Sequence, residues 1–496
     1  MKKFIRAIGV LLLFALLLSS VAGCRTNGDG ADTQNTAPQG TQPKETDAPK
    51  KDEPPKTPLD LNGYSIVIPD GATDTTVESL SAHELKAVLA ELGYSVIVKE
   101  DEGAEHVDAR SILLGKTAAT AGNMPTGNKF TVTEKNERVQ ISAGNYYGYR
   151  AALDFLKGKI TEAGGVPRDL NHTGTATVAN TARATANSIR VMFYNLYGFE
   201  SWRGNTGTTA PSAALRQDLQ RDLLGAYAPD VIGFQEYFRS FEDGGQNGAA
   251  DYHGSFTSSM TRLGYMQVET EVGNENCTPL FYNPLKLRVL ESGSSYFTKG
   301  DANQTKGMTW AVFEVVTGDE VGKVFAVFGA HFFQNSDDLT AEQAEEARIH
   351  NATELIGAVG EVTAEYEGIA VIVGGDFNYW NVRAAGETHE TLTNGGLTYM
   401  AELDGKGPAE VTNRWKADGE YSEYTESYHG FYGYDAQSKT YDVSENTLTS
   451  ARYTLDYIFL GGNADAVSIK KFIIINDELT YRASDHSPTF VDLFFN

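Results

Sequence analysis

The sequence predicts two folded modules of mixed helix and strand, a small α/β module followed by a larger, strand-rich domain. Three observations support this organisation. The 496 residues exceed the length of one ordinary domain. Strand-like and helix-like patterns alternate between about residues 60 and 180, which is typical of an α/β unit. From residue 189 onward, apolar runs with the length of buried strands recur, and each carries a polar residue at or near one end.

The N-terminus has the layout of an export signal. Two lysines and an arginine precede an apolar run over residues 8–18, which is too short for a stable membrane span. The string SSVAGC that follows resembles a bacterial lipobox. This resemblance implies that residues 1–24 are a lipoprotein signal peptide and that Cys24 is the lipidation site. We therefore expect an exported protein, anchored by acyl chains on Cys24 to the outer face of a bacterial membrane.

A linker and a small module follow the signal. Residues 25–58 are rich in Thr, Pro, Gly, Asp, Lys and Gln and contain few hydrophobic residues, so we expect a disordered linker. Residues 59–180 are expected to form a small α/β accessory domain. Within it, Ser81 and Glu84 form a capping-box pattern at the start of a helix expected over 81–92. The other expected elements are strands over 64–69, 94–100 and 111–116, a hairpin turning at 135–137, and a helix over 147–156.

The string GYRAALDFL after this hairpin resembles part of the small domain that precedes the catalytic barrel in several bacterial glycoside hydrolases. The resemblance leaves two roles open, a spacer and a surface that contacts a cell-surface glycan. It also raises the alternative of a carbohydrate-active enzyme, which requires a pair of catalytic carboxylates. No carboxylate pair in this module looks catalytic. Residues 165–187 are expected to be a polar connection to the larger domain.

The net charge restricts the classes of partner. The chain carries 41 Lys and Arg against 66 Asp and Glu, a net charge of −25. A strongly acidic protein repels polyanions at long range, which argues against broad, charge-driven binding of nucleic acid. An enzyme whose bound metal supplies local positive charge remains compatible with this composition. With two cysteines in the chain, a disulfide framework is not expected.

In the larger domain, 188–496, six apolar runs each bring polar residues to a strand end. Strand ends are the places where a rigid sheet brings distant residues together. Carboxylate and amide oxygens are hard ligands that suit Mg²⁺ or Mn²⁺, and the amides can also donate to a phosphate oxygen. In chain order the polar residues are Asn195, Glu236, His331, Asp376 with Asn378, Asp456, and Asp485 with His486.

This ordered set, with the strings GGDFN and SDHSP, resembles the endonuclease/exonuclease/phosphatase superfamily, whose fold is that of pancreatic-type deoxyribonuclease. The resemblance spans nearly all of 188–496. It implies the α+β fold class, with a four-layer α/β/β/α sandwich of two packed, mostly antiparallel sheets flanked by helices. It also implies a divalent-metal-dependent hydrolase that acts on a phosphodiester or phosphomonoester, with Mg²⁺ or Mn²⁺ as its cofactor.

The resemblance implies a role for each residue as well. Glu236 would hold the metal with Asn195 nearby, and Asp485 would be a metal ligand or orient its neighbours. Asp376 would orient or deprotonate the attacking water, and Asn378 would fix the phosphate.

Two histidines complete the implied set. His486 would be the base or the cation that faces the transition state, held in its useful tautomer by Asp456. His331 would donate to the phosphate or protonate the leaving oxygen, so the assignment of acid and base stays open. One position departs from the family pattern, because either Glu275 or Asn276 occupies the place where many members have a glutamate. The partner of His331 is therefore also open.

The sequence leaves several functions open. The phosphoester could belong to a nucleic acid, a lipid head group, or a small sugar or inositol phosphate. The alternatives are a secreted nuclease acting on DNA or RNA, and a non-catalytic surface binding protein on the same fold. The intact set of polar residues argues against the binding protein. A long aromatic segment with Tyr421, Tyr424 and Tyr428 either contacts the substrate or packs on itself. No obligate protein partner is inferred.

Overall fold

We describe the fold from a computed structural model, in which one compact unit spans Lys56–Asn496. Cys24, Glu275, Asn276, Tyr421 and Tyr424 lie outside the described residues. Within the described ranges, no helix has the length and apolar character needed to cross a membrane. The structure describes residues 56–72, 75–103, 108–198, 211–237, 252–272, 277–300, 305–335, 339–379, 386–402, 410–411, 427–428, 431, 434–435, 440–441, 454–475 and 477–496.

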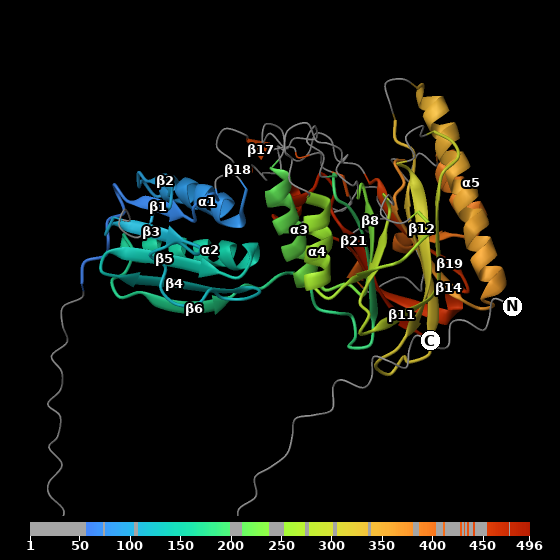
Figure 1. The fold of residues 1–496 in the computed structure, drawn as a ribbon, viewed down its shortest axis with the longest axis horizontal. Coiled ribbons are helices and arrows are strands. Elements are labelled where there is room, and N and C mark those ends of the chain that lie inside the picture. Colours follow the sequence, from blue (N-terminus) through green and yellow to red (C-terminus); the bar gives the residue numbers. More distant parts are fainter. Residues whose placement is uncertain are drawn as a thin grey trace, which may run out of the picture. The chain divides into compact units, whose positions relative to one another are not determined.

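The accessory domain is a six-stranded sheet packed with two helices (Figure 1). The strand order is β2-β1-β3-β5-β4-β6, parallel from β2 to β5 and antiparallel on both sides of β4. The elements are β1 (Ser65–Ile68), α1 (Val77–Glu91), β2 (Ile97–Glu100), β3 (Ser111–Leu114), β4 (Lys129–Lys135), β5 (Arg138–Ala143), α2 (Tyr146–Ala163) and β6 (Asn171–Thr175). The alternation predicted from the sequence is confirmed, and β6 lies in the segment expected to be a polar connection.

Local turn chemistry explains where the sequence-based bounds of these elements hold and where they fail. The hairpin turns at Asn136 and Glu137, which both have positive φ, as expected for a tight two-residue turn. The capping box predicted for α1 is wrong. The helix begins one turn earlier, because the Thr76 hydroxyl accepts a hydrogen bond from the Ser79 amide, and Glu84 is buried within the helix.

The larger domain contains two main sheets. The first has the order β16-β20-β21-β7-β8-β10-β9, and the second has the order β11-β12-β13-β14-β19-β15. The strands are β7 (Ile189–Asn195), β8 (Val231–Gln235), β9 (Met266–Gln267), β10 (Leu280–Tyr282), β11 (Leu287–Tyr296), β12 (Gly307–Val315), β13 (Val324–His331), β14 (Ala370–Asp376), β15 (Thr398–Tyr399), β16 (Glu410–Val411), β19 (Asp456–Gly462), β20 (Val467–Ile474) and β21 (Thr489–Phe495), and a separate pair is formed by β17 (Tyr434–Asp435) and β18 (Thr440–Tyr441).

Helices cover the outer faces of the two sheets. Figure 1 shows α3 and α4 on one side of the paired sheets and α5 on the other. Most strand pairs are antiparallel, with parallel exceptions such as β7 with β8 and β13 with β14. The predicted four-layer α/β/β/α sandwich and α+β class are therefore confirmed. The helices are α3 (Ala213–Tyr227), α4 (Tyr252–Arg262), α5 (Ala341–Glu365), α6 (Glu387–Asn394) and α8 (Thr480–Ala483), with short 3₁₀ turns η4 (Met400–Glu402) and η5 (Ala464–Ala466).

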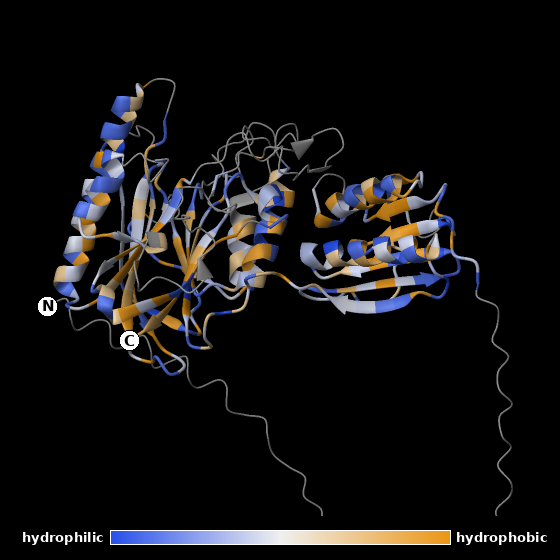
Figure 2. Cartoon of the chain, turned by 180° about the vertical axis from the view of Figure 1, so that it is seen from behind, coloured by the Kyte–Doolittle hydropathy of each residue, from blue (hydrophilic) through white to orange (hydrophobic). Residues whose placement is uncertain are grey.

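Hydrophobic side chains fill the space between the sheets, and Figure 2 shows the hydrophobic residues concentrated on their strands. Two glycines in the GGDFN string are required by this packing. A Cβ on Gly374 would lie 2.3 Å from the ring of Phe193, which comes from the facing sheet. Gly375 has φ +137°, and its Cβ would lie 2.0 Å from the carbonyl oxygen of Ala330. These glycines let the sheets approach closely and position the end of β14.

Candidate active site

Strand register brings the predicted polar residues to one edge of the sandwich. In the second sheet, His331 of β13 pairs with Asp376 of β14, which in turn pairs with Asp456 of β19. In the first sheet, Asn195 at the end of β7 pairs with Gln235 at the end of β8. Glu236 follows Gln235 directly. Residues separated by up to 261 positions in the chain thus become neighbours through backbone pairing and sheet packing.

Asp376 lies at the centre of the site. Its Oδ2 accepts a hydrogen bond from Asn195 Nδ2 at 3.0 Å and lies 3.3 Å from His331 Nε2 and 3.8 Å from His486 Nε2. Its Oδ1 accepts a hydrogen bond from the backbone amide of Asn378 at 3.0 Å. Asp376 is 2% exposed, so these contacts replace its hydration almost completely. One buried carboxylate therefore joins side chains from both sheets.

His486 is held from its other side by Asp456. The distance from His486 Nδ1 to Asp456 Oδ2 is 2.8 Å, and both side chains are buried. This contact orients the ring so that Nε2 points toward Asp376 and toward Asp485, whose Oδ1 lies 4.0 Å away. The carboxylate also favours the tautomer with a proton on Nδ1.

Two residues of the site adopt backbone conformations that ordinary side chains disfavour. Glu236 has φ +55° and Asn378 has φ +52°. Asn tolerates the left-handed region, whereas Glu adopts it at a cost of about 1–2 kcal/mol. Asn378 uses this conformation to donate from Nδ2 to the carbonyl oxygen of Phe332 at 3.0 Å. A strained Glu236 directly after a buried strand is consistent with a side chain aimed for function rather than for stability.

The two histidines have opposite charge preferences. Burial lowers the pKa of His331, and the neighbouring Lys306 cation lowers it further, so this ring is neutral at pH 7. Burial alone would lower the pKa of His486 too, but the carboxylates of Asp456 and Asp485 raise it above its ordinary value. His486 is therefore the protonated ring of the pair.

The pKa values of the two buried carboxyl groups, Asp456 and Asp376, are also shifted in opposite directions. Burial raises the pKa of Asp456, although the charge of His486 offsets part of this effect. Burial would also raise the pKa of Asp376, but His331, His486 and Lys306 hold it well below its usual range. Asp376 is therefore ionised at every pH at which the protein is expected to work. A carboxylate with so low a pKa orients a water molecule well and is a poor base.

Lys306 is a site residue that the sequence analysis missed. It is 4% exposed, and its Nζ lies 2.5 Å from His331 Nε2 and 3.3 Å from Nδ1. The residue precedes β12, whose first residue, Gly307, pairs with His331 in an antiparallel register. The sequence did contain a signal for this contact. If the two strands are paired as a hairpin, its length places Lys306 beside His331. Among the described residues, His331 contacts Lys306 and Asp376, and the assignment of Glu275 or Asn276 as its partner stays open.

Part of the aromatic segment also reaches the site. The Ser427 hydroxyl accepts hydrogen bonds from the backbone amides of Leu455 and Asp456, each at 3.0 Å. The ring of Tyr428 meets the ring of His486 edge to face, with centroids 5.0 Å apart. The described part of this segment therefore packs against site residues, and its contact with substrate stays a prediction.

The donor set suits a hard cation. Glu236, Asp485 and the amide oxygen of Asn195 are oxygen ligands of the kind that Mg²⁺ and Mn²⁺ prefer. Among the described residues, no group of three or more His, Cys, Asp or Glu side chains is arranged to hold a metal ion. Mg²⁺ binds proteins through one or two carboxylates and keeps several water ligands, and Glu236 and Asp485 are carboxylates of this kind.

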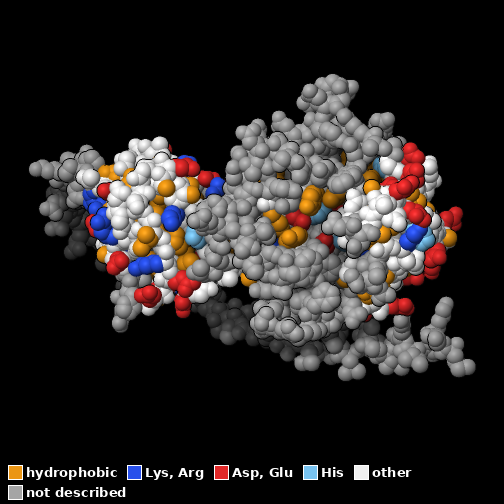
Figure 3. All heavy atoms as spheres, turned by 90° about the horizontal axis from the view of Figure 1, so that it is seen from above, with side chains coloured by type: hydrophobic (Ala, Val, Ile, Leu, Met, Phe, Trp, Pro, Cys, Tyr) orange, Lys and Arg blue, Asp and Glu red, His pale blue; other side chains and the backbone are white. Residues whose placement is uncertain are grey.

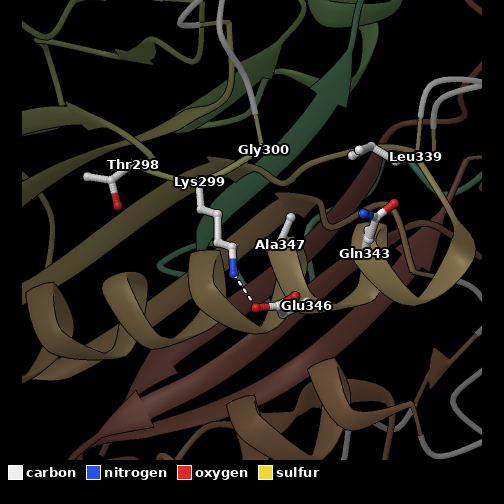
Figure 4. A pocket seen from close by; sticks show the side chains of 7 residues that line it. All are labelled: Thr298, Lys299, Gly300, Leu339, Gln343, Glu346 and Ala347. Atoms are coloured by element: carbon white, nitrogen blue, oxygen red, sulfur yellow. Dashed lines mark hydrogen bonds and ion pairs between the residues drawn. The ribbon is translucent and has the colours of Figure 1, made fainter.

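On the face seen in Figure 3, some acidic, histidine and hydrophobic side chains lie close together. A separate hollow of about 480 Å³ lies between the segment after β11 and the helix α5 (Figure 4). An ion pair between Lys299 and Glu346 crosses it. None of the predicted site residues lines this hollow, so we assign it no part in the chemistry.

Comparisons with known proteins give distant structural likenesses. No protein-family model matches the chain, and no curated protein is similar to it. A Bacteroides vulgatus endonuclease/exonuclease/phosphatase has 19% identity, with 62% of this chain and all of that chain covered and a TM-score of 0.43. A Bacteroides thetaiotaomicron mannosyl-6-phosphatase has 18% identity, the same coverage and the same TM-score. The catalytic domain of human Nocturnin has 18% identity over 64% of this chain and 96% of that chain, with a TM-score of 0.42.

Proposed function

We propose that residues 188–496 form a divalent-metal-dependent phosphoesterase of the endonuclease/exonuclease/phosphatase superfamily. The observation that carries the proposal is the position of Asp376, which lies within 4 Å of Asn195, His331 and His486 at one buried strand edge. A binding protein on the same fold has no need for this arrangement, because buried ionised groups are costly to assemble. Perturbed charge states gathered at one edge are typical of catalytic sites.

The charge states divide the work among the side chains. The ionised Asp376 accepts a hydrogen bond from the attacking water and orients it toward phosphorus. The protonated His486 faces the negative charge that develops on the phosphoryl oxygens, and Asp456 keeps its ring in place. Lys306 adds positive charge on the other side of the site, next to a neutral His331. Phosphoryl transfer depends mainly on such positioning and electrostatic stabilisation.

A bound divalent cation would complete this set. Glu236, with Asp485 and Asn195, would hold Mg²⁺ or Mn²⁺, which as a Lewis acid offsets the charge of the phosphoester. The site needs this added charge because the chain as a whole carries −25. The same acidity disfavours a long nucleic acid as the substrate, so we place lipid head groups and small phosphate esters ahead of DNA and RNA.

A panel of phosphate-release and diester-cleavage assays tests the proposal on the full chain. We expect turnover of at least one ester with Mg²⁺ or Mn²⁺, loss of turnover in EDTA, and recovery when the metal is restored. His486→Ala should abolish turnover, whereas His350→Ala should not, because His350 lies on α5 with its side chain 44% exposed. Absence of turnover on every ester would overturn the enzymatic function. Cleavage of DNA alone would make the protein a nuclease.

We also propose that the protein is exported and anchored through Cys24, as its lipobox-like sequence supports. Acyl chains on one cysteine provide membrane affinity in proportion to the methylene groups that they bury. In cell fractionation, the wild-type protein should then sediment with membranes, and Cys24→Ser should shift it to the soluble fraction. A wild-type protein that carries no acyl group by mass spectrometry would contradict this proposal.

A further inference from the structure

The accessory domain contacts the segment that leads into the catalytic loop. We infer that this domain is a positioning element, whose helices α1 and α2 hold α8 and thereby fix the catalytic loop, defined here as residues 484–486. The inference rests on the proposed function, since it concerns the placement of His486. It gives the accessory domain a role other than that of a spacer or a glycan-binding surface.

The first contact is a buried ion pair between the domains. Arg482 of α8 lies 2.9 Å from Glu84 Oε1 of α1, and the two side chains are only 5% and 6% exposed. The hydroxyl of Tyr146 donates to the same Glu84 oxygen at 3.0 Å, and the Arg482 guanidinium lies over the Tyr146 ring at 5.8 Å. Arg150 adds a second cation, 3.3 Å from Glu84 Oε2. Arg482 is thus the partner that the larger domain supplies to a Glu84 carboxylate that Tyr146 and Arg150 also contact.

The second contact acts on the start of α8. Asp477 accepts hydrogen bonds at Oδ1 from the amides of Leu479 and Thr480, at 3.1 and 3.0 Å, so it caps the turn that becomes the helix. Its other oxygen, Oδ2, accepts a hydrogen bond from the Tyr147 hydroxyl of α2 at 2.8 Å. Next to it, Glu478 lies 3.0 Å from Arg150. The accessory domain therefore contacts both the residues that precede α8 and the helix itself.

The third step leads from α8 into the site. The helix ends at Ala483, and the hydroxyl of Ser484 donates to the carbonyl oxygen of Asn195 at 2.7 Å. The same hydroxyl accepts a hydrogen bond from the backbone amide of His486 at 3.2 Å. Gln220 of α3 donates to the carbonyl oxygen of Ala483 at 2.8 Å. A displacement of α8 would therefore be transmitted directly to the backbone of His486.

The connection between the domains is fixed as well. Arg190 of β7 donates to the carbonyl oxygens of Thr181 and Ala182, at 3.0 and 3.1 Å, and forms a fully buried ion pair with Asp492. Asp492 also accepts a hydrogen bond from the Ala184 amide at 2.8 Å. The segment that joins the domains is therefore bound to the catalytic sheet, so the accessory domain is constrained at this end too.

The chemical nature of the contact distinguishes positioning from simple packing. A buried ion pair is often no more stabilising than hydrophobic residues of the same volume, because desolvation offsets the attraction. It does require one geometry, since a shifted partner leaves a buried charge without compensation. An interface built around Glu84 and Arg482 is therefore better suited to fixing the position of α8 than to adding stability.

The test uses the Tyr147→Phe variant of the full chain, which removes one hydroxyl and leaves the ring. The matched control is Tyr94→Phe, whose hydroxyl donates to the Gly164 carbonyl within the accessory domain. With bis(p-nitrophenyl) phosphate and Mg²⁺ as the probe, we expect kcat of Tyr147→Phe to fall about three- to tenfold, the factor that one hydrogen bond contributes to an equilibrium. KM should stay within about twofold and Tyr94→Phe should match the wild type, because the hydroxyl at position 147 does not touch the substrate.

A double-mutant cycle with Asp477→Asn identifies the contact responsible. If the two residues act through their shared hydrogen bond, the double variant should lose no more kcat than the larger single loss. Additive losses, or an unchanged kcat in Tyr147→Phe, would overturn the inference. Glu84→Gln provides a second variant, and its kcat should fall further because it leaves the Arg482 charge buried without its partner.

Hydrogen exchange separates this inference from the proposed function. The amides of residues 484–487 should exchange faster in Tyr147→Phe than in the wild type, and at the wild-type rate in Tyr94→Phe. If the wild type turns over no ester but this difference appears, the phosphoesterase proposal fails and the positioning inference stands. If the wild type is active and exchange at 484–487 is the same in all three proteins, the positioning inference fails alone.

Discussion

Replacing Asp456 with Asn tests the central pair of the site. Asp456 Oδ2 lies 2.8 Å from His486 Nδ1, and both side chains are buried. Two unit charges at this distance attract by about 6 kcal/mol at an effective dielectric constant of about 20. Breaking a buried pair by changing one partner typically costs about 3–5 kcal/mol. If the positive charge of His486 is needed in the transition state, kcat should fall about 10²- to 10⁴-fold.

The geometry gives a second reason for this loss. An Asn amide group can donate to Nδ1, which would favour the tautomer with its proton on Nε2 and no charge on the ring. An Asp-to-Asn exchange beside the catalytic histidine of a serine protease lowers kcat by about 10⁴-fold for the same reason. The predicted range therefore follows from the distance, the burial and the tautomer of one contact.

The assay is steady-state hydrolysis of a chromogenic phosphodiester with Mg²⁺, alongside thermal unfolding of each variant. Asp465→Asn is the matched control, because Asp465 is exposed in η5. This control should keep the wild-type kcat. The reasoning is refuted if folded Asp456→Asn retains kcat within about threefold of the wild type, since a contact worth several kcal/mol cannot then act on the reaction.

The remaining predictions concern charge, packing and pH. Lys306→Met should lower kcat about tenfold or more, because it removes a buried cation from the site. The control Lys323→Met, on the surface, should keep the wild-type kcat. Equal kcat values in the two variants would show that Lys306 has no part in the mechanism. Gly374→Ala should lower the free energy of unfolding by about 1–3 kcal/mol, because its Cβ meets the Phe193 ring. The control Gly357→Ala, in an open position of α5, should be neutral or stabilising by about 1 kcal/mol. Calorimetry measures both, and equal melting temperatures would contradict the packing argument. Burial raises the pKa of Asp222 to about 6, so the folded chain binds this proton more tightly than the unfolded chain does, and stability falls as the pH rises from about 4 to 6. This fall amounts to about 3 kcal/mol, and Asp222→Asn should abolish it in urea unfolding at the two ends of that window; an unchanged pH dependence would show that the carboxyl does not titrate there.

The strands that carry the site residues could be predicted because their signals are local. Asn195, His331 and Asp376 each end an apolar strand, and the strand bounds in the structure agree with the apolar runs. The close approach of the two sheets at Gly374 and Gly375, before Asp376, was not predicted and became visible only in the structure. Alternation of apolar and polar residues and the identity of turn residues depend on neighbours along the chain, so they can be read without the fold.

The start of α1 shows where such local signals compete. Thr76 and Ser81 are both plausible caps, and each is followed at a suitable distance by a residue that can support a helix start. Thr76 is the actual cap. Glu84 instead forms a buried ion pair with Arg482 of the larger domain. Tertiary contacts decided between two local alternatives of similar strength.

The sequence by itself indicated the strands that carry the site residues, and its resemblance to a known superfamily implied the fold class. Only the tertiary structure decided that Lys306 lies against His331 and that the accessory domain contacts α8. The physical reason is distance along the chain. A contact between residues 84 and 482 depends on how all the elements between them pack together. No periodicity or motif along the sequence specifies that packing.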